Sequence, residues 1–283
     1  MKKISVAIVA YNEEKHLPDC LKSVAWADEV IVVEGKSTDK TAEIAKKAGA
    51  KVFSVENQPL MKKMMNIAFT KCTGEWILQL DADERVSPEL KTEIEKIISA
   101  KSEHAAFRIP RKNLMFGKYL EYSGWYPDFQ LRLFKNGSGK YPAKNVHEEL
   151  EISGTIGNLE NPIMHLNWDT VSQFLLRLDS YTTHESEKWI SDGKSIVWTD
   201  VIRFPLSEFI SRFFDRKAYK DGLHGLVLSI LMAGYWELVF AKVWEKQGFW
   251  QYGDKNFLQE VSAQTKNIKF EWNYWLMASE TSP

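Results

Sequence analysis

Three acidic side chains follow an apolar run of the chain within four residues. The run at 76–80 leads directly into Asp81, Asp83 and Glu84, and the small Ala82 separates the two aspartates. Carboxylates two residues apart, at the point where a strand enters a loop, can share a hard divalent cation with water and a ligand's phosphates. The alternative interpretation is an acidic turn. The pattern favours a cation site at Asp83, with Asp81 acting directly or through water.

The residues before this acidic group alternate between short apolar runs and segments of helical periodicity. We expect strands at 4–10, 29–33, 51–55 and 75–80, and helices at 16–24, 41–48, 60–71 and 89–99. Strands and helices that alternate at this spacing are joined by right-handed crossovers. The first hundred residues therefore predict an α/β fold, with a parallel sheet covered by helices on both faces.

Polar residues follow the carboxyl ends of the predicted strands. In parallel sheets, ligands bind outside these strand ends. The first strand ends in Ala10, Tyr11, Asn12 and Glu13, and the second ends in Glu34. Together with the acidic group after the fourth strand, these residues predict a ligand site along one rim of the sheet.

The remainder of the chain changes in character twice. Residues 105–166 are rich in strand and turn signals, so we expect antiparallel strands that extend the sheet and form the second half of a cleft. From about residue 170 the pattern is helical. We therefore expect an α/β domain over 1–170 and a helical region, rich in aromatic and basic residues, over 171–283.

The composition limits the classes of partner and compartment. The 37 basic and 38 acidic residues nearly balance, so overall charge offers no reason to expect a nucleic-acid partner. Cys20 and Cys72 fit neither a disulfide framework nor a zinc site, and the N-terminus lacks the pattern of a signal peptide. We expect a reducing, cytoplasmic location. No run of 18 uncharged apolar residues occurs, so we expect no membrane-spanning helix.

The first half of the chain resembles family 2 glycosyltransferases, which have the GT-A fold. The motifs that carry this resemblance are residues 9–14, residues 31–41, and residues 74–76 leading into 81–84. Residues 125–128, 132–134, 146–148 and 220–225 resemble the branch that contains lipopolysaccharide core β-1,4-glucosyltransferases. The resemblance covers residues 1 to about 170. It implies a nucleotide-sugar-binding half at 1–100 and an acceptor half at 101–170.

The resemblance also implies the chemistry of the site. It implies a nucleotide-sugar donor, Mn²⁺ or Mg²⁺, and an inverting displacement at the anomeric carbon. In this family the acidic residue after the second strand faces the uracil, which assigns that role to Glu34. The family's usual run is Asp-Ser-Gly-Ser-Thr-Asp, and Glu34, Gly35 and Lys36 replace its first three positions. Lys36 thus brings a cation to a position where the family usually has glycine.

An inverting transfer needs a general base that removes the proton of the acceptor hydroxyl. In the family this is an acidic residue at the start of a helix after the middle strands, and Glu148 occupies that place. His147 beside it would orient the base or approach the metal. Asp128 is the alternative base, because Trp125 and Tyr126 give it an aromatic neighbourhood suited to stacking on a sugar.

Three further residues are candidates for binding roles. Lys63 is a candidate second cation near the diphosphate, and its alternative is a solvated helix lysine. Arg132 should point away from both Leu131 and Leu133, so that it reaches a phosphate or pairs with a strand-end acid. His165 is a candidate third metal ligand. A hydrogen-bonded core histidine is the alternative, and a lone histidine on a strand favours it.

The C-terminal region has the composition of a surface helix at a membrane. Residues 203–219 interleave arginine and lysine with aromatic side chains, and residues 226–236 form an uncharged apolar run. This pattern is typical of a helix lying on an anionic bilayer. The alternative is that the aromatic side chains pack on the catalytic domain or on a second subunit. Because Glu237 interrupts the apolar run, we expect it at most to enter the membrane interface.

These observations predict a metal-dependent inverting glycosyltransferase. We expect it to move a hexose, glucose from UDP-glucose, to a saccharide acceptor of a bacterial surface glycolipid or glycan, with the enzyme peripheral to the inner membrane. The alternatives are transfer to a polyprenyl phosphate or a polypeptide, a nucleotidyltransferase, and an inactive binding module. The glycine-rich first loop of a nucleotidyltransferase is missing at 10–13. The intact acidic group argues against an inactive module.

Overall fold

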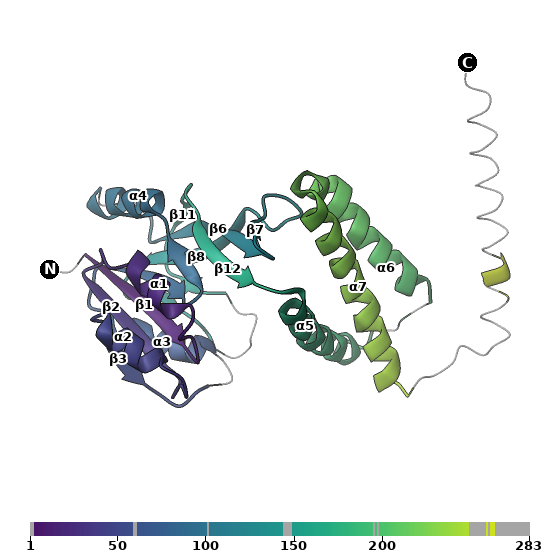
Figure 1. The fold of residues 1–283 in the computed structure, drawn as a ribbon, viewed down its shortest axis with the longest axis horizontal. Coiled ribbons are helices and arrows are strands. Elements are labelled where there is room, and N and C mark those ends of the chain that lie inside the picture. Colours follow the sequence, from purple (N-terminus) through teal and green to yellow (C-terminus); the bar gives the residue numbers. More distant parts are fainter. Residues whose placement is uncertain are drawn as a thin grey trace, which may run out of the picture. The chain divides into compact units, whose positions relative to one another are not determined.

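The computed structural model describes residues 3–58, 61–100, 102–143, 149–194, 196, 198–248, 259 and 261–263. The chain divides into two compact units (Figure 1). The first comprises residues 1–177 and 206–233, and the second comprises residues 178–205 and 234–283. The first unit thus includes a segment from the predicted helical region.

The first unit is built on a mixed sheet of ten strands in the order β3-β2-β1-β4-β8-β6-β12-β5, and β7 and β11 also pair with β6. The strands are β1 (Ile4–Ala10), β2 (Glu29–Glu34), β3 (Lys51–Ser54), β4 (Trp76–Asp81), β5 (Glu84–Val86), β6 (Ala106–Met115), β7 (Lys118–Tyr119), β8 (Asp128–Lys135), β11 (Ile156–Asn158) and β12 (Ile163–Trp168). A separate pair of strands comprises β9 (Gly139–Lys140) and β10 (Glu151–Ile152).

The first four strands run parallel, and their register brings the predicted rim together. Within these pairs, Ala10 lies opposite Glu34, and Val9 lies opposite Asp81. β8 runs antiparallel to both β4 and β6, whereas β12 is parallel to β6. The carboxyl ends of β1, β2 and β4 therefore meet at one edge, as the alternating pattern predicted.

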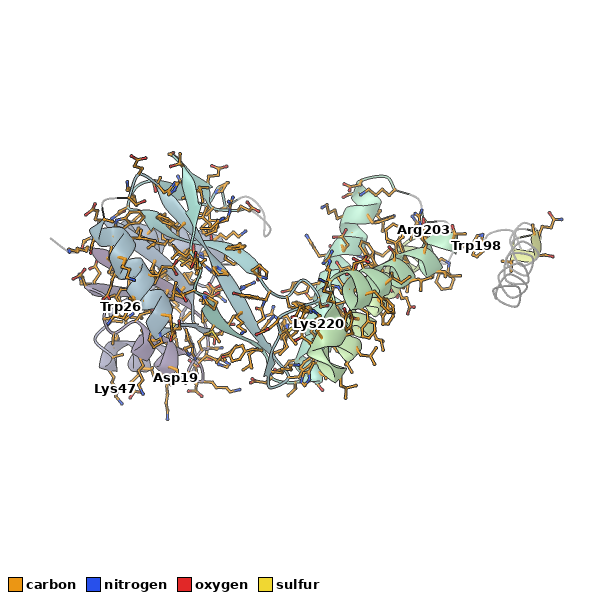
Figure 2. The ribbon with its side chains drawn as sticks, turned by 90° about the horizontal axis from the view of Figure 1, so that it is seen from above. Asp19, Trp26, Lys47, Trp198, Arg203 and Lys220 are labelled. Carbon is orange, nitrogen blue, oxygen red and sulfur yellow. The ribbon has the colours of Figure 1, made fainter. Side chains whose placement is uncertain are left out.

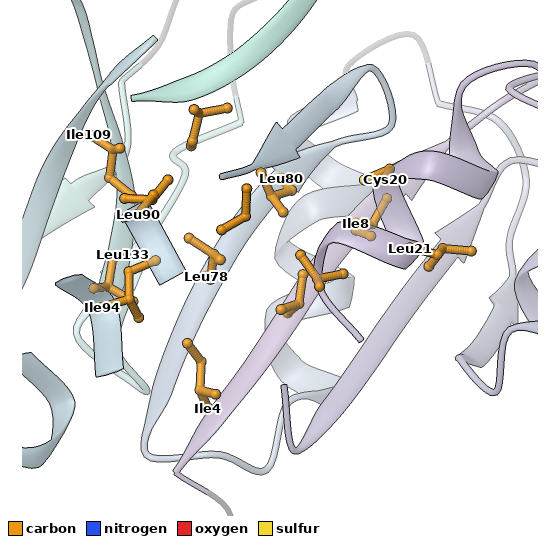
Figure 3. Packing of buried hydrophobic residues seen from close by; sticks show 14 of the residues in the cluster. Ile4, Ile8, Cys20, Leu21, Leu78, Leu80, Leu90, Ile94, Ile109 and Leu133 are labelled. Carbon is orange, nitrogen blue, oxygen red and sulfur yellow. The ribbon is translucent and has the colours of Figure 1, made fainter. Parts of the chain in front are cut away.

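Helices cover both faces of this sheet. On one face, α1 (Leu17–Ser23), α2 (Thr41–Lys47) and α4 (Pro88–Ser99) pack on one cluster of buried side chains. Figure 3 shows side chains from α1 and α4 packed on those of the strands. On the other face, α3 (Met61–Lys71) packs on the second cluster. Nearly every strand residue of β1 is buried, because the sheet is covered on both sides.

The expected strands and helices of the first hundred residues are present, with ends that differ by at most one residue. Helix α4 begins as its sequence suggests, because the Ser87 side chain accepts a hydrogen bond from the backbone N–H of Leu90 and Pro88 occupies the first turn. Strand β5 was not expected. It begins at Glu84, immediately after the two aspartates, and pairs with β12.

The C-terminal region is helical, as predicted. It contains α5 (Val171–Ser191), α6 (Trp198–Ile210), a π-helical turn η1 (Ser211–Asp215), a 3₁₀ helix η2 (Ala218–Asp221) and α7 (Leu223–Lys246). In the second unit the aromatic rings of Trp189, Phe204, Trp236 and Phe240 pack together, with ring centroids 5.1–6.3 Å apart. These rings form an aromatic core for that unit.

Helix α7 is long and apolar enough to cross a membrane by length and composition. Its most apolar 18-residue window has a mean hydropathy of 1.7, and 28% of that window is buried. The sequence predicted no membrane-spanning helix, because that prediction required 18 uncharged apolar residues and Glu237 interrupts the run. Trp236 and Phe240, on the C-terminal half of α7, pack against the aromatic core of the second unit. Core packing therefore accounts for part of the apolar character of α7.

Candidate functional site

Two loops at the rim are joined by reciprocal hydrogen bonds. The Asn12 side chain accepts from the backbone N–H of Thr38 at 2.9 Å, and the N–H of Asn12 donates to Ser37 Oγ at 3.2 Å. The N–H of Glu13 donates to Thr41 Oγ1 at 2.7 Å. Asn12 has a φ of 56°, a left-handed conformation that asparagine tolerates better than most residues. The loops after β1 and β2 thus form one ledge.

Glu34 lies beneath this ledge and is buried. One of its carboxylate oxygens accepts from the N–H of Ser37 at 2.7 Å, and the other accepts from the Ser54 hydroxyl. Lys36 has a φ of 54°, a left-handed conformation that glycine adopts without strain. Its ammonium group pairs with Glu56. The positive charge of Lys36 is therefore directed at Glu56, a neighbouring acid of this chain.

The two aspartates after β4 have different environments. Arg132 donates to Asp81 Oδ2 at 2.6 Å and to Glu84 Oε1 at 2.7 Å. Glu84 Oε2 accepts the backbone N–H of Asp81 at 3.0 Å, so the turn between the acids is closed by its own third carboxylate. Arg132 and Glu84 are both buried. Asp81 is thus neutralised by an arginine, whereas the ion pair of Asp83 among the described residues is with His165.

Arg132 reaches these acids from a β-bulge. The pairing of β6 with β8 shifts register between Phe107, which faces Leu133, and Arg108, which faces Leu131. Leu133 belongs to the core beneath α1 and α4, whereas Leu131 packs against the core beneath α3. The expectation that both leucines share one face was wrong, because the extra residue breaks the alternation. Of the two predicted roles for Arg132, the one seen in the structure is pairing with strand-end acids.

The ion pairs continue from Glu84 to the alternative base, Asp128. Arg111 Nη1 lies 3.6 Å from Glu84 Oε1. The Nε and Nη2 groups of Arg111 donate to Asp128 Oδ2 at 2.8 and 2.6 Å, and Gln130 Nε2 donates to the other oxygen at 2.7 Å. Both oxygens of Asp128 are therefore engaged with this chain's own donors, which disfavours proton abstraction by Asp128.

Asp83 faces His165. Their closest atoms, Oδ2 and Nε2, are 3.4 Å apart, and the Asp83 side chain is 33% exposed. Burial raises the pKa of Asp83, but hydrogen bonding and charge from His165 outweigh it, so the pKa lies below its usual value. The other ring nitrogen of His165, Nδ1, lies 2.6 Å from Asn113 Oδ1. The structure therefore brings together two of the three predicted metal ligands, Asp83 and His165.

The charge around Glu13 tests whether this rim suits a cation. Burial, followed by the negative charges of Asp83, Asp39 and Asp81, raises the pKa of Glu13 to about 7. Within the described ranges, no three His, Cys, Asp or Glu side chains are grouped so that they could hold a metal ion. The residues thus fit a cation that takes one or two protein ligands and shares a diphosphate and water, as Mg²⁺ commonly does.

A comparison with protein families decides the class. Residues 5–149, just over half of the chain, match the model of glycosyl transferase family 2. The chain belongs to that family. Its mixed sheet, with helices on both faces, confirms the predicted GT-A fold. The family also selects a glycosyltransferase over the nucleotidyltransferase alternative.

Relatives of this family 2 glycosyltransferase cover most of its length. It is 26% identical to the lipopolysaccharide core biosynthesis glycosyltransferase LpsC of Rhizobium meliloti, over 86% of this chain and 92% of LpsC. It is 28% identical to an uncharacterized glycosyltransferase of Rickettsia typhi, over 97% of this chain and 92% of that protein. Among solved structures, residues 1–349 of Staphylococcus aureus TarS with UDP-GlcNAc give a TM-score of 0.47 at 15% identity, over 87% of this chain and 92% of that chain.

The glycosyltransferase has further predicted site residues outside this acidic group. Tyr11 is exposed at the rim. Ala10 and Ala82 are buried, and they precede polar residues of the rim in the chain. Lys63 is exposed on α3. The predicted base Glu148 and its neighbour His147 lie outside the described residues.

Sequence reasoning missed a clamp on the loop between β7 and β8. The buried Asp221 accepts the backbone N–H of Tyr122 at 2.9 Å and of Glu121 at 3.2 Å. The N–H of Ser123 donates to the carbonyl of Arg216 at 2.9 Å. The Arg212 guanidinium donates to the Ser123 carbonyl at 2.9 Å and lies over the Trp125 ring, 5.4 Å from its centroid. Residues 211–221 of this glycosyltransferase therefore hold the aromatic loop at 121–126.

Proposed function

We propose that this family 2 glycosyltransferase is metal-dependent and inverting, and that it transfers a hexose from a UDP-sugar, glucose from UDP-glucose, to a saccharide acceptor. The acceptor is part of a bacterial surface glycolipid or glycan. The observation that carries the proposal is the difference between the two aspartates after β4. Asp81 is neutralised by Arg132, whereas Asp83 faces His165 across 3.4 Å at a partly exposed position.

Asp83 and His165 are the residues that would hold the cation. Mn²⁺ or Mg²⁺ bound there would neutralise charge on the diphosphate leaving group. Glu13 lies at the same rim, where burial is the largest cause of its raised pKa and the negative charges of Asp83, Asp39 and Asp81 raise it further. The ledge formed by Asn12 and Thr38, with Glu34 beneath it, is the proposed seat of the nucleoside.

Glu148 is the proposed general base. It would take the proton from the acceptor hydroxyl on the face of the sugar opposite the leaving group. The engagement of both Asp128 oxygens favours Glu148 over Asp128 for this step. Asp128 and Arg111 would instead stiffen the start of β8, next to the aromatic loop that we propose receives the acceptor sugar.

One relative whose name states a function supports the acceptor class. LpsC of Rhizobium meliloti is described as a lipopolysaccharide core biosynthesis glycosyltransferase, and it aligns with 86% of this chain. The alternative is transfer to a polyprenyl phosphate or to a polypeptide. A survey of acceptors would distinguish these from transfer to a saccharide.

A donor survey tests this function. Purified protein would be incubated with Mn²⁺ or Mg²⁺ and UDP-, GDP- or dTDP-sugars, and nucleoside diphosphate release would be measured with and without EDTA. The proposal predicts chelator-sensitive release from UDP-glucose above all other donors. Preference for a GDP- or dTDP-sugar would contradict the assigned donor. Equal release of nucleoside diphosphate with and without EDTA would contradict the proposed metal dependence.

We further propose that the enzyme is cytoplasmic and works at the inner face of the membrane. Along α6 and η1, Leu206, Ile210 and Phe214 recur every four residues, and their exposed fractions are 55%, 43% and 56%. This spacing places them along one side of the helix. Asp215 comes next, and then Arg216 and Lys217; all three are exposed. Figure 2 shows the side chains of this helical region, with Arg203 and Lys220 labelled.

An apolar stripe that ends in cations fits an anionic bilayer surface. Flotation with vesicles containing phosphatidylglycerol should recover the protein, and pure phosphatidylcholine should recover less. Phe214→Glu should weaken flotation, and Met61→Glu, at an exposed position on α3, is the matched control. If Phe214→Glu instead splits a dimer and leaves flotation unchanged, the stripe is a subunit interface.

A further inference from the structure

A chain of hydrogen bonds joins Asp83 to the aromatic loop through one asparagine. Asn113 on β6 lies directly beside His165 on β12 in the register of the sheet. Asn113 Oδ1 is 2.6 Å from His165 Nδ1, and Asn113 Nδ2 donates to the carbonyl of Trp125 at 2.8 Å. Asn113 and His165 are both buried. The order Asp83, His165, Asn113, Trp125 thus runs from the acidic motif to the loop at 121–126.

The chemistry of these groups fixes the orientation of the Asn113 amide and places a hydrogen on His165 Nδ1. A backbone carbonyl can only accept, so the group of Asn113 that faces Trp125 must be the NH₂. The amide oxygen of Asn113 then faces His165, and it too can only accept. His165 must therefore carry a hydrogen on Nδ1. In the neutral imidazole this leaves Nε2 with a lone pair directed at Asp83, 3.4 Å away.

Two acceptors that face each other at this distance need a cation between or beside them. In the neutral histidine the Nε2 lone pair and the Asp83 carboxylate repel, and either a proton on Nε2 or a bound metal removes the repulsion. Outer hydrogen bonds that fix the tautomer and orientation of a ligand histidine are a general feature of metal sites. Asn113 makes such a bond here.

The second half of the Asn113 side chain acts on the loop. Besides the bond to the Trp125 carbonyl, the backbone carbonyl of Asn113 accepts the N–H of Leu120 at 3.0 Å. Asp221 and Arg212 hold the same loop from the other side. The position of Trp125 is therefore set jointly by the C-terminal clamp and by the residue that orients His165.

We propose that Asn113 is a positioning residue that couples the Asp83–His165 pair to the aromatic loop at 121–126, so that the two are held in one geometry. That the pair serves the donor and the loop serves the acceptor rests on the proposed function. The hydrogen-bond logic does not, because it follows from the donors and acceptors alone.

The first test is the tautomer of His165 in metal-free protein. Long-range ¹H–¹⁵N correlation spectra of histidine-labelled protein, with His165 assigned from a His165→Gln sample, distinguish the two neutral tautomers. In spectra of the neutral ring, the proposal predicts the Nδ1–H tautomer in the wild type. An Nε2–H tautomer would overturn it, whether or not the protein turns over a UDP-sugar.

The second test separates the two halves of the side chain. Asn113→Leu removes both bonds, and Asn113→Asp keeps an acceptor for His165 but loses the donor to Trp125. The Mn²⁺ affinity, measured by electron paramagnetic resonance in the presence of UDP, should fall about 10- to 100-fold in Asn113→Leu and only a few-fold in Asn113→Asp. Hydrogen exchange at residues 121–126 should accelerate in both variants.

Asn136→Leu is the matched control. Asn136 also donates twice to backbone carbonyls, those of Cys72 and Gly74, but it does so at the opposite end of β4. It should lose stability without changing Mn²⁺ affinity or exchange in the loop. If Asn113→Leu behaves like Asn136→Leu in both measurements, the coupling is refuted. Absence of Mn²⁺ binding in the wild type would refute the proposed metal instead, and exchange in the loop would still decide the role of Asn113.

Discussion

The guanidinium of Arg132 lies 2.6 Å from a carboxylate oxygen of Asp81. This contact makes the two aspartates of the acidic motif unequal, because Asp81 has a permanent cationic partner and Asp83 does not. Burial alone would lower the pKa of Arg132, but Asp81 and Glu84 raise it above the usual value, so the charge of this arginine is fixed. Arg132 thus joins Asp81 and Glu84 across the turn, and we propose Asp83 as the residue that serves ligand chemistry.

Arg132→Met should be strongly destabilising. It leaves Glu84, which is fully buried, without its arginine partner at 2.7 Å. Breaking a buried pair by removing one partner typically costs about 3–5 kcal/mol. Chemical denaturation would measure the loss. The double variant Arg132→Met with Glu84→Gln should recover part of it, and a loss below about 1 kcal/mol in the single variant would contradict the pairing.

Glu13→Gln should stabilise the metal-free protein at alkaline pH. The folded pKa of Glu13, about 7, lies above the ordinary 4.5, so the folded state binds the proton more tightly. The stability that this proton contributes is complete below pH 4.5 and is lost as the pH rises through 7. Glutamine cannot ionise. The unfolding free energy of Glu13→Gln should therefore match the wild type near pH 4.5 and exceed it at pH 8.

Denaturation in EDTA at several pH values would measure this difference. Glu14→Gln is a neighbouring control, since Glu14 is an acid of the same loop. A difference between Glu13→Gln and the wild type that stays constant from pH 4.5 to 8 would show that burial and the charges of Asp83, Asp39 and Asp81 do not raise the pKa of Glu13.

Glu148→Gln and Asp128→Asn should fail in different ways. Loss of a general base lowers the rate by about 10²- to 10⁴-fold, and we expect this of Glu148→Gln with stability unchanged. Asp128→Asn removes the charge that pairs with Arg111, so it should chiefly lower stability, by about 1–3 kcal/mol. Steady-state rates and denaturation curves would be compared. A larger loss of kcat in Asp128→Asn would assign the base to Asp128.

Much of the fold could be predicted because its signals are local. The strands and helices of the first hundred residues are each set by periodicity and end signals over about ten residues, as with Ser87 and Pro88 at the start of α4. The rim followed from one general rule, since the ends of parallel strands meet at the same edge. Asp81, Asp83 and Glu34 were located from these two steps.

The contacts that distinguish these residues could not be predicted, because they depend on register between distant strands. Arg132 is aimed by a bulge, and no feature of its own neighbours signals one. Asn113 is one polar residue within β6, and its role appears only when β12 places His165 beside it. The clamp joins residues about 90 to 100 positions apart, as in the bond from Arg212 to Ser123. Such pairings are properties of the assembled sheet.

We propose that Asp83 carries the metal-dependent chemistry of this family 2 enzyme. The most direct measurement is the rate of UDP release from UDP-glucose by the wild type and by Asp83→Asn, each with Mn²⁺ and with EDTA, after circular dichroism has shown equal folding. Asp19→Asn, at an exposed position on α1, is the control. We expect EDTA and Asp83→Asn each to abolish release, and Asp19→Asn to leave it unchanged. Release by Asp83→Asn at the wild-type rate would contradict this proposal.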